Sequence, residues 1–299
     1  EGMCDELGKS MYGTRDASQN WEEEYGSTML KLGYTKGLAS PCVFYHEKRN
    51  LRVVVHGDDF TILGLANDLD WFKERITDKY EIKHRGRLGP GDSDDKQIRI
   101  LNRVVWWNHE GIHCGLDQRH AEIMVKMMGA GDKKTVVTPG VKPCDDKEEE
   151  GDDERIEEGR VTRYRAVVAR GNYLSQDRLD IKYAIKELCR WMGKPRNKDW
   201  RRLIRLSKYL VDRERYINEY KYQDEVGKLD VWTDTDYTGC RETRKSTSGG
   251  LIMLGTHLIS GWSATQRVIA LSSGEAEYYG VVRGAAEAMG TQSILKDWG

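Results

Sequence analysis

The feature of this sequence that most constrains its fold is a run of acidic residues near the middle of the chain. Between Asp145 and Glu158 there are 10 Asp or Glu residues against 2 Lys or Arg, with no periodic apolar face. Such a stretch cannot bury enough apolar surface to form a packed element, so we expect a solvated, flexible linker. The chain should therefore fold as separate parts on either side of it.

A basic segment follows the acidic run directly. Between Arg160 and Tyr216 there are 17 Lys or Arg residues against 6 Asp or Glu. A surplus of this size can follow a phosphate backbone. The exposed sides of ordinary amphipathic helices give the same count, so charge alone leaves the two interpretations even.

Size and composition indicate a globular protein with more than one core. The chain has 299 residues, of which 38% are hydrophobic and 32% charged, and no apolar run is long enough to span a membrane. The N-terminus resembles neither a signal peptide nor an initiator segment, so we expect a fragment of a longer intracellular protein. Six scattered cysteines without C-x-x-C spacing are typical of reduced thiols rather than of a structural metal site.

Hydrophobic periodicity predicts an α+β fold. Before the acidic run we expect helices at 16–32, 67–80 and 120–128, and strands at 42–45, 51–56, 60–63, 80–84, 97–107 and 111–115. After it we expect helices at 162–174, with a break near Gly171, and at 180–192 and 198–211. Strands at 229–233, 250–254, 258–263 and 268–271 and a helix from Ser273 complete the pattern.

Two adjacent carboxylates, Asp58 and Asp59, follow Gly57 after a predicted strand. A tight turn lets at least one of them project into a cleft, where it can hold Mg²⁺, an ion that prefers oxygen ligands and substrate phosphates. The same three residues are common in ordinary hairpin turns, and taken alone the pattern favours that interpretation.

A second carboxylate pair lies near the C-terminus. Asp234 stands at the end of a predicted strand, and Glu275 and Glu277 stand at the start of the terminal helix. A strand-end Asp and a helix Glu can share divalent cations for phosphodiester hydrolysis. One glutamate is expected to cap the helix with Ser272 instead, and Glu277 is the better catalytic candidate because Glu275 fits the capping position.

These motifs occur in the order shown by copia-type retrotransposon Pol proteins. S-M-Y-G-T-R-D-A at 10–17 with Trp21 resembles the S-L-Y-G-L-K-Q-A-P-R-x-W stretch of their reverse transcriptases, and V-H-G-D-D at 55–59 stands where they carry Y-V-D-D. Other segments resemble their T-P, Y-R-x-x-V-G-x-L-x-Y-L, R-P-D-I and RNase H stretches: 138–139, 164–174, 178–181, 233–239, 243–249, 270–273 and 275–278. The chain thus resembles the end of a reverse transcriptase joined to the start of an RNase H.

The resemblance implies a domain order and a fold for each part. It implies a palm and thumb remainder at 1–142, the acidic linker at 143–160, a helical basic connection at 161–226 and a truncated RNase H-like α/β domain at 227–299. The implied parent is an RNA-directed DNA polymerase with RNase H that uses two-metal Mg²⁺ chemistry. Its implied partners are RNA template, DNA primer, RNA–DNA hybrid, dNTP and the remaining Pol polyprotein, in the cytoplasm or nucleus and without a membrane.

Carried over residue by residue, the resemblance assigns roles to named side chains. Asp58, Asp59, Asp234 and Glu277 become metal ligands and catalytic carboxylates, with Asp234 and Glu277 close enough to share a cation. Nucleotide or nucleic-acid contacts fall to a glycine and six arginines: Gly13, Arg15, Arg165, Arg178, Arg201, Arg202 and Arg205.

The sequence also departs from the family pattern. His56 and Gly57 replace the Tyr and Val of Y-V-D-D, and Ser18 and Leu179 replace two prolines. The family's first polymerase aspartate lies before the stretch that the chain covers, and the remaining RNase H carboxylates lie after it. We therefore expect incomplete sites and an inactive fragment; the alternative function is a decayed or co-opted remnant that binds nucleic acid without catalysis.

Overall fold

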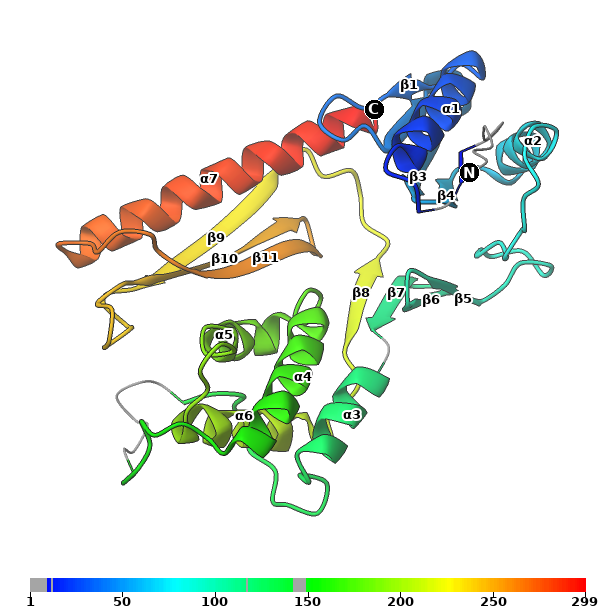
Figure 1. The fold of residues 1–299 in the computed structure, drawn as a ribbon. Coiled ribbons are helices and arrows are strands. Elements are labelled where there is room, and N and C mark those ends of the chain that lie inside the picture. Colours follow the sequence, from blue (N-terminus) through cyan, green and yellow to red (C-terminus); the bar gives the residue numbers. More distant parts are fainter. Residues whose placement is uncertain (1–9, 12, 117, 142–148) are drawn as a thin grey trace, which may run out of the picture. The chain divides into compact units, whose positions relative to one another are not determined.

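A computed structural model of the chain describes residues 10–11, 13–116, 118–141 and 149–299 (Figure 1). It contains helices and three antiparallel sheets, which confirms the predicted mixture of α and β structure. The chain forms two compact units. One comprises the residues up to His84 together with Glu287–Gly299, and the other comprises Arg85–Ala286.

The first unit contains two helices and one sheet. The sheet is a meander in the order β1-β2-β3-β4. In chain order the elements are α1 (Ala17–Lys31), β1 (Thr35–Lys36), β2 (Val43–His46), a single 3₁₀ turn (Glu47–Arg49), β3 (Leu51–His56), β4 (Asp59–Leu63) and α2 (Ala66–Thr77).

Strand β3 supplies the centre of this unit's core. Its residues alternate between the two faces, so Leu51, Val53 and Val55 are all buried on one side. Tyr25 and Met29 of α1 pack against them, four residues apart and therefore on one face of the helix. The sheet and α1 are thus held together by apolar packing whose period is visible in the sequence.

The carboxylate of Asp297 closes a loop in the same unit. It accepts hydrogen bonds from three consecutive backbone amides, those of Leu38, Ala39 and Ser40, at 2.8–2.9 Å. Partial burial raises the pKa of Asp297, but the three amides lower it more, and the net pKa lies below the usual range. The last turn of the chain therefore belongs to this unit through charge-assisted hydrogen bonds.

The second unit contains two sheets and the helices between them. One sheet has the order β5-β6-β7-β8 and the other has the order β11-β10-β9. The elements are β5 (Gln97–Ile100), β6 (Arg103–Asn108), β7 (Gly111–Leu116), α3 (Arg119–Met127), α4 (Glu158–Leu174), α5 (Leu179–Cys189), α6 (Asn197–Leu210), β8 (Ile217–Lys221), β9 (Leu229–Asp236), β10 (Thr247–Leu254), β11 (His257–Thr265) and α7 (Ser273–Asp297), whose last residues belong to the first unit.

Helices α3 to α6 enclose the main core of this unit. Met124 of α3, Val168 of α4, Ile185 of α5 and Leu206 of α6 are among its fully buried members. The predicted break at Gly171 is wrong, because α4 runs through it. A Cβ at Gly171 would lie 2.2 Å from Cδ1 of Ile185, so the glycine permits close approach of α4 and α5.

Small residues bring α7 against the β9 sheet (Figure 1). Ala276, Gly280 and Gly284 are buried on one face of the helix at intervals of four residues. A Cβ at Gly280 would lie 2.5 Å from Oγ1 of Thr235, and one at Gly284 would lie 2.6 Å from Cγ2 of Thr233. The helix therefore covers the face of β9 that carries these threonines.

Several predicted boundaries differ from the structure. The expected strand at 97–107 is the β5–β6 hairpin, which turns at Leu101 and Asn102, both at positive φ. The expected strands at 80–84 and 268–271 do not form, and β8 was not predicted. The compact units also divide the chain differently from the domains drawn on the motifs, because α3 packs into the core of α4, α5 and α6.

Within the described residues, no helix combines the length and the apolar character that a bilayer crossing requires. Four cysteines have free thiols, namely Cys42, Cys114, Cys189 and Cys240. Cys4 and Cys144 lie outside the described residues.

We predict that Leu206→Ala lowers the free energy of unfolding by about 2–5 kcal/mol, because it leaves a cavity in a fully buried site of α6. The matched control is Leu271→Ala, since that side chain is 86% exposed and belongs to the same unit. Urea titration followed by circular dichroism measures both variants. Equal losses would contradict the assignment of this helical core.

Candidate functional site

The predicted polymerase carboxylates lie at the tip of a hairpin. His56 pairs with Asp59 across β3 and β4, which leaves Gly57 and Asp58 as a two-residue turn. Gly57 has φ +62° and Asp58 has a negative φ, the combination found in type II′ turns. Asp58 and Asp59 are both exposed, so the turn predicted from the sequence is confirmed.

Helix α1 holds this hairpin from the side. Nε1 of Trp21 donates a hydrogen bond to the backbone carbonyl of Gly57 at 2.8 Å, and its ring packs edge-on against Phe60. Gly13 and Arg15 are exposed just before α1 in the same unit. Their predicted nucleotide contacts stay predictions, but these two residues and the carboxylates belong to one framework of α1, β3 and β4.

We predict that Gly57→Ala destabilises the first unit by about 1–2 kcal/mol, because a Cβ is disfavoured at this positive φ. Gly57→Asn should lose less, since Asn tolerates the left-handed region. The control is Gly26→Ala in the interior of α1, where a Cβ meets nothing within 4 Å. That change should stabilise by about 0.5–1 kcal/mol. Denaturant titration of the three variants checks the opposite signs.

Asp234 lies in β9, on the face opposite to the threonines that meet α7. Thr233 and Thr235 contact α7, and alternation places Asp234 on the other face, directly across from Gly249 of β10. Gly249 has no side chain, so the exposed carboxylate of Asp234 has open space beside it. The neighbouring Asp236 is instead engaged, because its Oδ1 accepts a hydrogen bond from the amide of Thr247.

The two glutamates at the start of α7 have different environments. Oγ of Ser272 accepts a hydrogen bond from the amide of Glu275 at 3.1 Å, and Oε2 of Glu275 accepts one from the amide of Leu271 at 2.7 Å. This arrangement confirms the capping role for Glu275. Glu277 is exposed. The structure brings β9 and α7 together, but Asp234 is on the face of β9 away from α7, and the cation shared with Glu277 stays a prediction.

We predict that Glu275→Ala lowers the stability of the second unit by about 1 kcal/mol, because the amide of Leu271 and the hydroxyl of Tyr279 lose the carboxylate that accepts their hydrogen bonds. Glu277→Ala removes an equally placed negative charge without a capping bond and should change stability by less than about 0.5 kcal/mol. Thermal unfolding distinguishes the two. A larger loss for Glu277→Ala would reverse the assignment of cap and candidate catalytic residue.

The carboxylates alone make only partial metal sites. Oxygen donors such as Asp58 and Asp234 suit Mg²⁺, which commonly takes one or two protein carboxylates plus substrate phosphates. Two-metal phosphoryl transfer requires ions held about 4 Å apart. Among the described residues there is no group of three or more His, Cys, Asp or Glu side chains that could hold a metal.

Two of the predicted nucleic-acid arginines, Arg165 and Arg205, have internal partners. Nε and Nη2 of Arg165 donate to the carbonyls of Met192 and Gly193 at 2.9 and 3.2 Å. Nη2 of Arg205 donates to Oγ1 of Thr138 at 2.9 Å. Both side chains support loops around α6, and their predicted nucleic-acid contacts are not tested by these bonds.

Arg178 is fully buried, unlike the other arginines of this set. It is only 1% exposed and pairs with Asp180 through Nε at 3.2 Å and Nη2 at 2.6 Å. Its Nη1 donates to the carbonyl of Arg213 at 2.6 Å. A guanidinium this enclosed cannot reach a phosphate backbone without opening the core, so the structure gives Arg178 a structural role.

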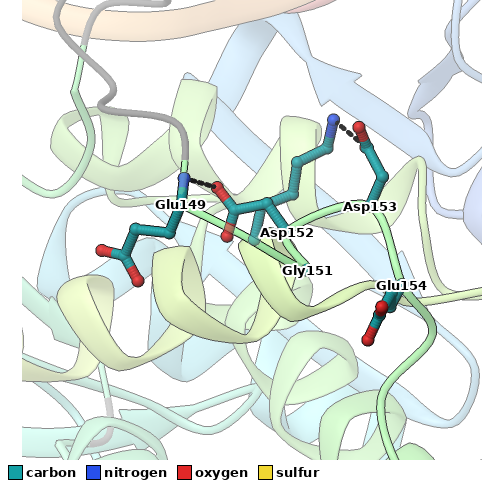
Figure 2. A pocket seen from close by; sticks show the side chains of 6 residues that line it. Glu149, Gly151, Asp152, Asp153 and Glu154 are labelled. Carbon is teal, nitrogen blue, oxygen red and sulfur yellow. Dashed lines mark hydrogen bonds and ion pairs between the residues drawn. The ribbon is translucent and has the colours of Figure 1, made fainter.

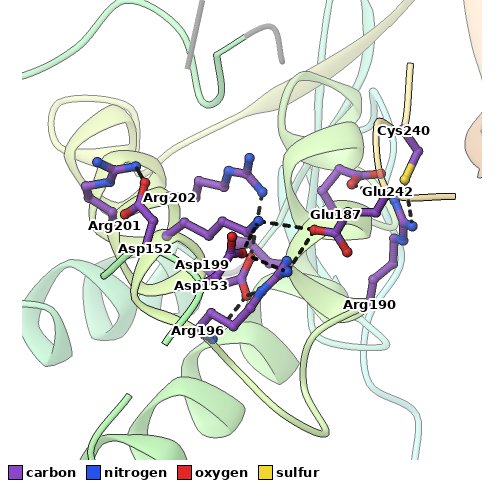
Figure 3. Close-up of polar contacts among 12 residues, drawn as sticks. Asp152, Asp153, Glu187, Arg190, Arg196, Asp199, Arg201, Arg202, Cys240 and Glu242 are labelled. Atoms are coloured by element: carbon purple, nitrogen blue, oxygen red, sulfur yellow. Dashed lines mark hydrogen bonds and ion pairs between the residues drawn. The ribbon is translucent and has the colours of Figure 1, made fainter. Parts of the chain in front are cut away.

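The start of α6 carries a network of charges (Figure 3). The carboxylate of Asp199 is 1% exposed and accepts hydrogen bonds from the amide and Nε of Arg196, both at 3.1 Å. The Arg196 guanidinium lies 3.4 Å from the ring centroid of Trp191 and pairs with Glu242 at 2.7 Å. Arg202 lies 3.7 Å from Asp199 on the next turn. These cations surround a buried negative charge.

The described half of the acidic run is ordered against this network (Figure 2). Asp152 pairs with Arg201 at 2.7 Å and Asp153 pairs with Lys198 at 2.6 Å, while Glu149 also pairs with Arg201. The Lys198 ammonium holds the pKa of Asp153 below its usual range. The prediction of a flexible linker is therefore wrong for residues 149–156; residues 142–148 lie outside the described part of the chain.

Backbone contacts fix the same segment. The amides of Asn197 and Lys198 donate to the carbonyls of Glu154 and Asp152 at 2.9 and 3.0 Å. Ile156 is 5% exposed and packs into the helical core. Sequence reasoning did not single out Arg196 or Lys198 among the binding residues; the available signal was the direct succession of an acidic and a basic run.

The chain is similar to Pol polyproteins of plant transposons. It is 25% identical over 98% of its length to the "Retrovirus-related Pol polyprotein from transposon RE2" of Arabidopsis thaliana, and equally so to that from transposon RE1 of the same plant. It is 25% identical over 99% of its length to the "Retrovirus-related Pol polyprotein from transposon TNT 1-94" of Nicotiana tabacum. The chain spans about a fifth of the length of these relatives. No protein-family model and no solved structure matches it.

Proposed function

We propose that the chain is the segment of a retrovirus-related Pol polyprotein of a transposon that joins a reverse transcriptase to an RNase H, because it is similar to such polyproteins over nearly its whole length. The observation that carries the proposal is the collinear similarity over nearly the whole chain, with both carboxylate motifs at exposed positions of separate units. In this proposal RNA template, DNA primer, RNA–DNA hybrid and dNTP are the ligands of the parent polyprotein, and its remaining domains are partners.

The proposed polymerase side of the segment lies in the first unit. Asp58 and Asp59 at the hairpin tip contribute oxygen ligands for Mg²⁺, and Gly13 and Arg15 before α1 face the nucleotide and template. The rigid contact between Trp21 and the carbonyl of Gly57 supports this role, because a catalytic turn must be held in one position.

The proposed RNase H side lies in the second unit. Asp234 of β9 and Glu277 of α7 contribute carboxylates, while Glu275 caps the helix. A bound divalent ion supplies charge neutralisation and activation of an oxygen nucleophile there. Each described carboxylate pair is a partial ligand set, so we propose that the chain by itself binds substrate but turns it over little or not at all.

A second candidate function is a decayed or co-opted remnant that binds nucleic acid without catalysis. The observation that favours it is the same absence of a group of three potential metal ligands among the described residues. The altered V-H-G-D-D sequence at the hairpin also fits this candidate. The two functions make different predictions for the longer parent polyprotein: the first expects it to be catalytically active, and the second expects it to be inactive.

We predict that the chain binds an RNA–DNA hybrid with an affinity that falls steeply between about 50 and about 200 mM salt and depends little on sequence. Fluorescence anisotropy across a salt series measures this. Asp234→Asn and Glu277→Gln should leave the affinity within about twofold, because neither carboxylate contributes a cation to phosphate binding.

Primer-extension and RNA-cleavage assays with Mg²⁺ test the catalytic half of the proposal. The chain should show little turnover, whereas the longer parent polyprotein should show both activities. In that longer protein Asp58→Asn should abolish extension, and Asp234→Asn or Glu277→Gln should abolish cleavage. An inert parent that still binds hybrid would establish the remnant instead, and salt-insensitive or absent binding would contradict both functions.

A further inference from the structure

The acidic segment 149–153 makes contacts with α6 that resemble those of a bound polyanion. Three carboxylates from five consecutive residues reach cations on the first turns of α6: Glu149 and Asp152 meet Arg201, and Asp153 meets Lys198. Asp153 also lies 3.3 Å from Arg196. Residues 150–153 form a turn that brings these negative oxygens close together. A nucleic-acid strand also presents closely spaced negative oxygens to cationic side chains.

The cations on α6 are suited to phosphate as well as to carboxylate. Guanidinium groups bind both through paired N–H donors, and an ammonium binds phosphate as a point charge. Arg196, Lys198 and Arg201 are all within or directly before the first two turns of one helix. Glu242, from the loop between β9 and β10, also pairs with Arg196 and Lys198, at 2.7 and 3.1 Å.

The burial of the acidic side chains shows which contacts are displaceable. Asp153 and Glu149 have side chains that are 79% and 66% exposed, so their ion pairs are screened by salt and contribute little stability. Asp152 is only 12% exposed and is bound more firmly, to Arg201 and to the amide of Glu149. The segment therefore pairs with the cations of α6, but two of its three carboxylates stay exposed to solvent and can be displaced.

We propose that the start of α6, through Arg196, Lys198 and Arg201, is a binding surface for the phosphate backbone of nucleic acid, and that residues 149–153 cover it as an intramolecular competitor. The proposal rests on the nucleic-acid binding set out above and adds where the phosphates bind and what opposes them. A polyanion that displaces the exposed carboxylates binds the same cations in their place. The backbone hydrogen bonds between residues 152–156 and 195–198 hold the segment next to α6 while its carboxylates are displaced. Binding is thereby weakened rather than abolished.

The test is to neutralise the competitor without changing its shape. The variant Glu149→Gln/Asp152→Asn/Asp153→Asn should bind an RNA–DNA hybrid about fivefold to tenfold more tightly than the unaltered chain at constant salt. The slope of log affinity against log salt should steepen by about 1–2, since Arg201 and Lys198 lose the carboxylates of this segment while Glu242 still pairs with Lys198. The double variant Glu149→Gln/Asp153→Asn, which alters only the exposed side chains, should show part of the gain with its fold intact.

The matched control is Glu219→Gln/Asp224→Asn/Glu225→Gln. These three acids are exposed on β8 and just after it, so the control makes the same change of net charge outside the 149–153 segment. It should raise the affinity by less than about twofold. Adding Arg201→Gln to the neutralised triple variant should remove most of the gain, because it removes a cation that two of the three neutralised carboxylates contact.

Each outcome decides the matter. An unchanged affinity of the triple variant, an equal gain in the control, or a gain that Arg201→Gln does not reverse would overturn the competitor, even though the unaltered chain binds hybrid. Absence of hybrid binding by every variant would instead overturn the nucleic-acid role itself. If the triple variant gains equal affinity for hybrid and for heparin, and none for a neutral polymer, the result supports a surface that binds the charge of the phosphate backbone alone.

Discussion

A buried carboxylate organises the helical half of this protein. Asp199 has almost no exposed surface, and a charge in that position requires cations and hydrogen bonds around it. Arg196 donates to Oδ2 of this carboxylate through both its amide and its Nε, and this cap fixes the first residue of α6. The guanidinium of Arg196 lies against Trp191, and its Nη1 reaches Asp153 and Glu242, so the network extends outward from the core.

The opposite charge runs are therefore parts of one structure. The net charge of −1 includes an acidic run at 145–158 and a basic segment at 160–216, whose opposite charges pair with each other at the start of α6. The side chain of Asp199 is enclosed, whereas that of Asp153 is exposed. Salt therefore screens the ion pair of Asp153 more strongly than that of Asp199. The buried contacts of Asp199 stabilise α6, whereas the exposed contacts of Asp153 can exchange with other anions.

Both predicted carboxylate motifs depend on close backbone approach. Gly57 allows the two-residue turn that places Asp58 at a hairpin tip, and Gly280 allows α7 to lie on β9 beside Thr235. In each case a side chain at the glycine would strain or separate the elements that carry the acids. Asp58, Asp234 and Glu277 are themselves exposed, so the glycines and not these acids determine how the elements approach one another.

The sequence by itself determined the features encoded within a few residues: the helices α1 and α5, the strand β3, the turn at Gly57 and the cap at Glu275. It also indicated the resemblance to retrotransposon Pol proteins, because the motifs occur in the order of that family although each single motif is weak. Only the tertiary structure decided that α4 passes unbroken through Gly171, that β8 pairs with β7, that Arg178 is buried and that residues 149–153 lie on α6. Each of these depends on a partner distant in the chain, whose packing or charge outweighs local propensity and which no local pattern specifies.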